Sequence, residues 1–203
     1  MKFRLMAVAV VALGATAGRA DVPEGADVVV GEEGRAAPFK TEKAYGDVQV
    51  HLEWQLRDER ARKLAGNYRY NARINFPGAG SVYVCDANGT SGRTPWVNAM
   101  PADSVAGAVL FQNPPTVNTT RGYGEWNSMD IVYRAAQWEG TNMVRQAEVT
   151  VFQNGVLVQD HWGMEGDPNW VYRGKPTKPK AAKQPISFER GTALFRNVWV
   201  KEI

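Results

Sequence analysis

Polar residues that could carry acid and base chemistry alternate with apolar ones between Asp47 and Arg57. His51, Glu53 and Gln55 lie at every second position of this stretch. Side chains two positions apart on a strand point to the same face of a sheet, so these three would project together. A carboxylate beside an imidazole can move protons at a reacting centre. The alternative is an ordinary solvated face. The apolar positions between them are Val48, Val50, Leu52, Trp54 and Leu56.

A second group of candidate residues lies between Trp126 and Arg134. Asp130 and Arg134 alternate with apolar residues, and they would face the same side as Glu53 if that sheet formed the concave surface. The alternative is an Asp–Arg pair that only satisfies the sheet. Trp126 and Asn127 lie where this strand begins, and Trp126 could serve as a flat binding surface or as an interior aromatic.

The last apolar stretch of the chain contains Arg196 followed by Asn197. Neighbours on a regular strand must point to opposite faces. Arg196 could bind a substrate oxygen, and an internal ion pair is the alternative.

Neither a metal site nor a cofactor site is predicted. Asp160, His161 and Glu165 are ligand-type residues, but their spacing matches no known metal-binding rule. Cys85 is the single cysteine, so it cannot form an intramolecular disulfide. Its place in an alternating apolar run favours a buried structural thiol over a nucleophile.

The first 20 residues have the pattern of a cleavable signal peptide. Lys2 and Arg4 precede an apolar run too short for the about 20 residues that span a bilayer, and small residues flank Arg19. Cleavage before Asp21 would remove three of the 24 basic residues and leave 21 against 21 acidic ones. The neutral mature chain, without a basic cluster, excludes a nucleic-acid partner. We expect export to the periplasm or the extracellular space, with no membrane span after cleavage.

The remaining chain predicts an N-terminal leader at residues 21–46 and a single domain at residues 47–203. Asn154-Gly155 is a hairpin signal, because a type I′ turn needs positive φ at both central residues. Only Asp58–Leu64 has the composition of a short helical turn. Many short strands joined by Gly- and Pro-rich loops indicate an all-β fold, a two-sheet antiparallel β-sandwich. Strands are expected at 47–57, 70–76, 81–85, 106–111, 129–134, 147–153, 156–159, 185–188 and 194–200.

Four sequence segments carry a family resemblance: AVLFQNPPTVN from Ala108, GEWNSMDIVYRA from Gly124, VTVFQNGVLVQD from Val149 and LFRNVWVKEI from Leu194. Together they resemble the 3-keto-disaccharide hydrolase family, whose members are concanavalin-like jelly rolls, over Asp47 to Ile203. The resemblance implies chemistry on sugars oxidised at C3. The keto group acidifies the C2 hydrogen, so a base can remove it, the glycosidic oxygen leaves, and water can add to the product.

The chain departs from the family pattern at polar positions. The family's Asn-Ser-Gly corresponds to residues 71–73, where Asn71 is kept. The family's Tyr-Glu-Val-Gln has Ser81 in place of the Glu and Tyr83 in place of the Gln. Its Gln-Asp-His-Gly has become Phe188-Glu189-Arg190-Gly191, without the His. Since core positions are kept, the departures point to altered or lost chemistry on a retained fold.

Because the family has a Glu at position 53, the resemblance favours an enzyme with Glu53 and Asp130 as acid/base residues and Arg196 as an electrostatic helper. The predicted substrate contacts are His51, Trp126, Asn127 and Arg134, and the predicted partner is a saccharide or 3-keto-glycoside. A carbohydrate-binding module without turnover and a structural domain without a sugar site are the alternatives. The sequence does not indicate an oligomeric state.

Overall fold

The computed structural model describes residues 21–56, 72–76, 80–85, 106–109, 112–121, 124–164, 183–189 and 193–203. Within these ranges all regular elements are strands. Their bounds are β1 Asp27–Val30, β2 Arg35–Ala36, β3 Phe39–Lys40, β4 Val48–Leu56, β5 Ala72–Phe76, β6 Gly80–Cys85, β7 Asn127–Arg134, β8 Gln137–Glu139, β9 Asn142–Arg145, β10 Ala147–Gln153, β11 Val156–Met164, β12 Ser187–Glu189 and β13 Ala193–Glu202. A search of the same ranges for a helix able to cross a membrane finds none.

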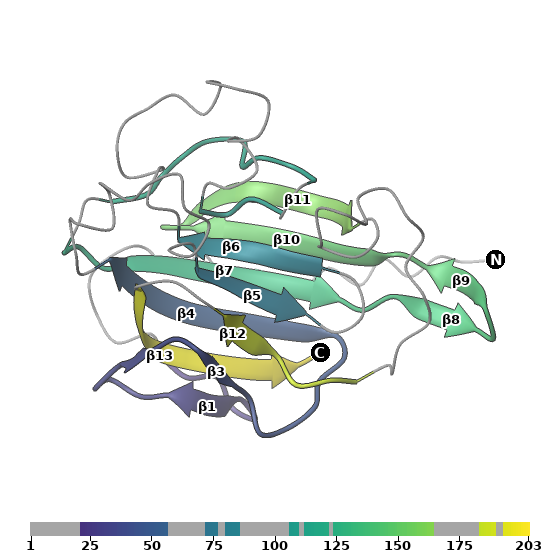
Figure 1. Ribbon diagram of the computed structural model, residues 1–203, viewed down its shortest axis with the longest axis horizontal. Coiled ribbons are helices and arrows are strands. Elements are labelled where there is room, and N and C mark those ends of the chain that lie inside the picture. Colours follow the sequence, from purple (N-terminus) through teal and green to yellow (C-terminus); the bar gives the residue numbers. More distant parts are fainter. Residues whose placement is uncertain are drawn as a thin grey trace.

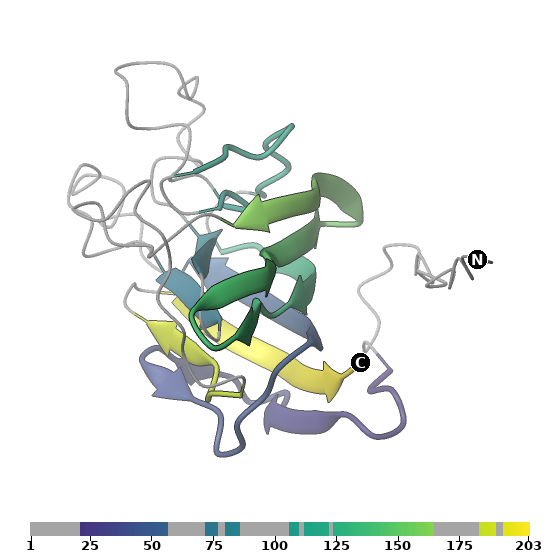
Figure 2. The ribbon, with the colours of Figure 1, turned by 90° about the vertical axis from the view of Figure 1, so that its right-hand side faces the viewer.

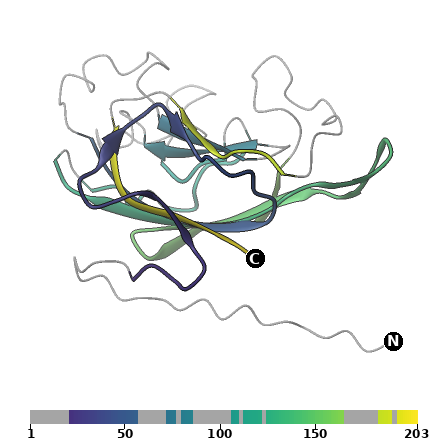
Figure 3. The ribbon, with the colours of Figure 1, turned by 90° about the horizontal axis from the view of Figure 1, so that it is seen from below.

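The strands form a two-sheet antiparallel β-sandwich of jelly-roll type (Figure 1). The large sheet has seven strands, in the order β1-β13-β4-β7-β10-β11 with β2 also paired to β13, and the small sheet has the order β3-β12-β5-β6. Strands from opposite ends of the chain are neighbours in both sheets, as β1 and β13 are in Figure 2. β8 and β9 form a separate hairpin that projects from one end of the sandwich (Figure 3). The predicted fold class is confirmed.

The core lies between the two sheets and follows from period-2 alternation. Val48, Val50, Leu52 and Trp54 on β4 are all 0% exposed, because they point from the large sheet toward the small one. Each such side chain contributes about 1.5–3 kcal/mol through removal from water. Aromatic side chains join the layers: Phe76 of the small sheet stacks on Tyr133 of the large sheet at a centroid distance of 4.6 Å. This packing forces the polar residues of β4 onto the opposite, outward face.

The predicted strand at residues 106–111 is wrong in the described part. Gly107 has a φ of 87°, and Val109 makes only isolated bridges, to Val82 and to Asn113. The Val109 amide donates to the Asn113 carbonyl and the Asn113 amide donates back. The apolar residues Ala106, Ala108 and Val109 are therefore buried without forming a strand.

The segment at residues 21–46, predicted to be an irregular leader, contributes strands to both sheets. β1 and β2 pair with β13, and β3 pairs with β12. Phe39 on β3 is 6% exposed and stacks on Phe188 at 4.5 Å. Strands of two to four residues carry too little periodicity to be recognised in a sequence. The hairpin β8–β9 was missed for the same reason, whereas the turn at Asn154-Gly155 has the predicted positive φ values, 50° and 79°. The helical turn predicted at 58–64 lies outside the described residues.

Candidate functional site

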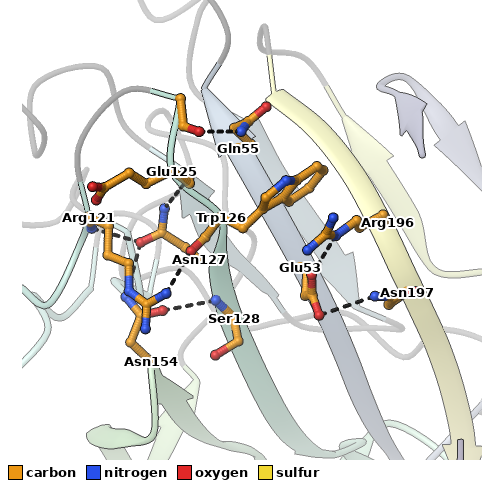
Figure 4. Close-up of polar contacts among 11 residues, drawn as sticks. Glu53, Gln55, Arg121, Glu125, Trp126, Asn127, Ser128, Asn154, Arg196 and Asn197 are labelled. Carbon is orange, nitrogen blue, oxygen red and sulfur yellow. Dashed lines mark hydrogen bonds and ion pairs between the residues drawn. The ribbon is translucent and has the colours of Figure 1, made fainter. Parts of the chain in front are cut away.

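The polar face of β4 contains an ion pair between two of the predicted catalytic residues (Figure 4). The Arg196 Nε donates to Glu53 Oε2 at 2.6 Å, and the Asn197 Nδ2 donates to Glu53 Oε1 at 3.1 Å. The Glu53 side chain is only 14% exposed and the Arg196 side chain 31%. Both carboxylate oxygens are therefore engaged in a partly buried contact between β4 and β13.

A β-bulge explains why Arg196 and Asn197 reach the same carboxylate. The prediction that they point to opposite faces is wrong, because the register of β13 against β4 shifts between Arg196 and Trp199. Asn197 adopts a φ of 49°, in the left-handed region, and its amide N–H donates to the Gly31 carbonyl on the far side of β13. Such a bulge re-aims a side chain and interrupts the alternation. The hydrogen bonds that Glu53 accepts from Arg196 and Asn197 therefore stabilise the bulge.

Replacing Asn197 tests how much the bulge depends on its backbone conformation. We expect Asn197→Ala to lower the free energy of unfolding by about 2 kcal/mol, since it loses a hydrogen bond to a charge and strains a left-handed position. Asn197→Gly loses the same bond but tolerates positive φ, and we expect it to recover about 1 kcal/mol of that loss. Urea unfolding of the two variants measures the difference. Equal stabilities would show that the backbone conformation contributes nothing.

Trp126 covers the same ion pair from the start of β7. The Arg196 guanidinium lies 3.9 Å from the centroid of the Trp126 ring, a cation–π contact (Figure 4). The Arg121 guanidinium donates to the Trp126 carbonyl at 3.1 Å, which holds the turn before β7. Arg196 therefore occupies one face of the Trp126 ring, which was predicted to contact a saccharide.

Asn127 is 1% exposed and acts within a turn network rather than at a surface. Its Oδ1 accepts from the Arg121 amide at 2.7 Å and from Asn154 Nδ2 at 3.0 Å. Asn154 Oδ1 in turn accepts from the Ser128 amide at 2.9 Å. These bonds join the start of β7 to the β10–β11 turn. Asn127, predicted to contact substrate, is thus buried within this turn network.

Asp130 lies two residues along β7 from the position opposite Glu53 and pairs with His51. Asp130 is directly across from His51 in the sheet, with 2.7 Å between Asp130 Oδ1 and His51 Nδ1. The Asp130 side chain is 40% exposed, whereas His51 is 7% exposed and stacks on Trp199 at 5.4 Å. Asp130, which was predicted to act in catalysis or to pair with Arg134, thus pairs with the His51 imidazole.

The three predicted catalytic residues therefore lie on one face of the large sheet, but they do not all contact one another. Glu53 and Arg196 contact each other, and Asp130 belongs to a separate pair with His51. Arg134 lies on the same face of β7 as Asp130, as predicted from the alternation. In Figure 3 the large sheet bends toward the small sheet, so this face is the convex one.

The outward face of the small sheet carries a second polar group that the sequence reading did not single out. Arg73 is directly across from Glu189, and its Nη2 donates to Glu189 Oε2 at 3.0 Å. Asn75 is directly across from Ser187, with Nδ2 donating to Ser187 Oγ at 2.9 Å. Ser187 Oγ in turn donates to Glu189 Oε1 at 3.2 Å. We call these four residues the Arg73–Glu189 cluster.

The electrostatics of the Arg73–Glu189 cluster favour the ionised carboxylate. Burial raises the pKa of Glu189, but hydrogen bonds from Arg73, Asn75 and Ser187 and the charge of Arg73 outweigh it and hold the pKa below its usual range. The Glu189 side chain is 40% exposed and the Arg73 side chain 24%. The cluster therefore presents an anionic oxygen beside a guanidinium at neutral pH.

This pKa shift predicts a pH dependence of stability. A carboxyl whose pKa is lower in the folded state stabilises the protein above the unfolded pKa, and that contribution is lost as the pH falls through the folded pKa. We expect the stability difference between the wild type and Glu189→Gln to be largest near neutral pH and to shrink below the usual carboxyl range. Urea unfolding across a pH series measures it. A difference independent of pH would contradict the assignment.

The sequence contained a signal for this cluster. Arg73 and Asn75 alternate with Ile74 and Phe76, both buried against the core. In the sheet, Arg73 is across from Tyr83 and Asn75 is across from Ser81. The departures from the family pattern thus include Arg73 on β5, Ser81 and Tyr83 on β6 and Glu189 on β12, which are adjacent strands of one sheet. Register information, which a single sequence lacks, brings them together.

Comparison with known protein families identifies the chain. A family model described as the 3-keto-alpha-glucoside-1,2-lyase-like domain matches residues 14–201. The chain belongs to this family. The resemblance seen in the sequence is confirmed, and the match begins ahead of β1. The 3-keto-alpha-glucoside-1,2-lyase-like family accordingly includes the strands β1 to β3 that the sequence reading left out of the domain.

Solved structures support the same assignment. A proposed glycosyl hydrolase from Parabacteroides distasonis ATCC 8503 superposes with a TM-score of 0.63 and 28% sequence identity, over 90% of this chain and 74% of that one. A second proposed glycosyl hydrolase from the same organism gives 0.53 and 16% identity, over 82% and 76%, and shows the fold alone. Curated proteins give no significant match. The family and its neighbours make this a carbohydrate-active protein.

Proposed function

We propose that this protein cleaves or hydrates 3-keto-glycosides at the Arg73–Glu189 cluster on the small sheet. One observation carries the proposal. Family positions that differ in this chain, the Gly that is Arg73 here and the Asp that is Glu189 here, face each other across adjacent strands and form an ion pair. In this chain, two positions of the family pattern that are neighbours in the sheet therefore hold a guanidinium and a carboxylate.

The chemistry asks for a base and for stabilisation of a developing enolate. Glu189 would take the C2 proton of a 3-keto sugar, while Arg73 stabilises the charge that gathers on the C3 oxygen. A C1–C2 double bond forms as the C1–O bond breaks, and the electron pair leaves with the glycosidic oxygen, which takes a proton from solvent. Asn75 and Ser187, which bond each other on the same face, would bind sugar hydroxyls. Water can then add to the unsaturated product.

The large-sheet face supports this role less well. The Glu53 side chain is 14% exposed, against 40% for Glu189, so a substrate would have to displace Arg196 or Asn197 to reach it. Asp130 is accessible, but among the described residues its ion-pair partner is the His51 imidazole, and no guanidinium or ammonium pairs with it to stabilise an enolate. We therefore propose that Glu53 and Arg196 hold the sheet together and that the small sheet carries the chemistry.

Incubating the purified mature protein with a 3-keto-glucoside tests the proposal directly. Release of the aglycone, followed by appearance of the hydrated 3-keto sugar, is the expected result. An unchanged substrate at high protein concentration would refute the enzymatic function.

A saccharide-binding function without turnover is the second candidate. Its support is that both Glu189 oxygens accept hydrogen bonds and that the pKa of Glu189 is lowered, so the carboxylate is a weak base. Saccharide binding that survives Glu189→Gln, with no product formed by the wild type, would favour this function.

We propose further that the protein works outside the cytosol, in the periplasm or beyond the cell. The support is the basic, apolar and small-residue order of residues 1–20. Mass determination of the protein recovered from the export compartment checks it, and a chain that still begins at Met1 would contradict it.

A further inference from the structure

Lys40 extends the Arg73–Glu189 cluster by one strand. Its backbone position is directly across from Ser187, and Ser187 is directly across from Asn75, so these three residues form one row across β3, β12 and β5. Phe39 and Phe188 occupy the core side of the same strands. Because directly paired residues face the same side, Lys40 lies on the outward face with the cluster. Lys40 is exposed and makes no ion pair within the described part of the chain.

Arg73 has a donor that the cluster does not use. Its Nη2 bonds Glu189, but its Nε is buried and has no hydrogen-bond partner. A buried donor without an acceptor costs about 1–3 kcal/mol, more when the group is charged. An acceptor that approached this side of the guanidinium would recover part of that cost.

The charges on this face do not balance. Among the described residues of these three strands that face outward, Lys40 and Arg73 are cationic and Glu189 is the one anion, already bonded by Arg73. A surface with excess charge of one sign concentrates ligands of the other sign.

We infer that the small-sheet face selects an acidic saccharide, a sugar or neighbouring residue that bears a carboxylate, and that Lys40 is the residue that recognises it. The inference rests on the proposed function, because it places the substrate on the same cluster. Strands lie about 4.8 Å apart, so the row from Lys40 to Asn75 spans about 10 Å at the backbone. A carboxylate bound at the Lys40 end would place the oxidised ring over Asn75 and Arg73.

Paired substrates test the inference. The probes are a 3-keto-glucoside and the matching 3-keto-glucuronoside, which differ only in the C6 carboxylate. We expect kcat/KM to favour the glucuronoside by about tenfold, which corresponds to about 1.4 kcal/mol, and we expect the preference to shrink as the salt concentration rises. Lys40→Gln should reduce the ratio to near one. Lys201→Gln, the same change on the large sheet, should keep it.

Binding of the corresponding glucuronoside and glucoside without the keto group separates the two proposals. A preference for the glucuronoside in binding, without turnover of either keto sugar, would support the inference and refute the enzymatic function. Equal turnover of both keto sugars, or a preference that Lys40→Gln leaves unchanged, would overturn the inference alone. If neither sugar binds nor reacts, both proposals are wrong.

Discussion

Replacing Glu53 with alanine is expected to lower the free energy of unfolding by about 3 kcal/mol, the low end of the cost of breaking a buried ion pair. The carboxylate accepts from Arg196 at 2.6 Å and from Asn197 at 3.1 Å, and its removal leaves a guanidinium and an amide without their acceptor. Arg196 is 31% exposed and also contacts Trp126, which limits the loss. Urea unfolding measures the effect.

A double-mutant cycle shows whether the loss comes from this contact. The stability effects of substitutions in one ion pair are not additive. Glu53→Ala combined with Arg196→Ala should therefore lower the free energy of unfolding by less than the sum of the single changes. Glu139→Ala is the matched control, because Glu139 is exposed on β8, and it should change stability by less than about 0.5 kcal/mol. A stable Glu53→Ala protein that has lost turnover of a 3-keto-glucoside would instead return Glu53 to the catalytic role predicted from the sequence.

The sequence predicted the sandwich because its long strands are strictly periodic. On β4 and β7 every second residue is buried, so the strands, the core and the shared outward face of Glu53 and Asp130 could all be derived from alternation. The short strands β1, β2 and β3 could not, because two to four residues contain no recognisable period. Their place is decided by pairing with β13 and β12, residues that lie more than a hundred positions away.

The candidate site was harder to predict than the fold, for two physical reasons. The bulge at Asn197 depends on a left-handed backbone conformation that alternation cannot reveal, so Arg196 and Asn197 were assigned to opposite faces. The Arg73–Glu189 contact depends on the register between β5 and β12, which a single sequence does not contain. The local sequence pattern therefore predicts which polar residues lie on strands, but it does not determine which of them contact one another.

Replacing Glu189 with glutamine is expected to lower kcat on a 3-keto-glucoside by about 10²- to 10⁴-fold, the usual contribution of a general base. Glutamine keeps the size of the side chain and one oxygen that can accept from Arg73, and its amide nitrogen can donate to the Ser187 hydroxyl, so the fold should persist while the proton acceptor is lost. Because the pKa of Glu189 is lowered, the acid limb of the wild-type kcat profile should lie at or below the usual carboxyl range. Steady-state rates across a pH series measure both effects.

Asp130→Asn provides the comparison that locates the chemistry. Asp130 is 40% exposed, as Glu189 is, and it pairs with His51 on the opposite side of the sandwich. If the small sheet carries the reaction, Glu189→Gln lowers kcat by this factor and Asp130→Asn does not, although both remove one negative charge of similar exposure. The reverse result would place the reaction on the large sheet, with His51 and Asp130 as its acid/base pair. Thermal unfolding of both variants shows whether a lower rate reflects loss of the fold.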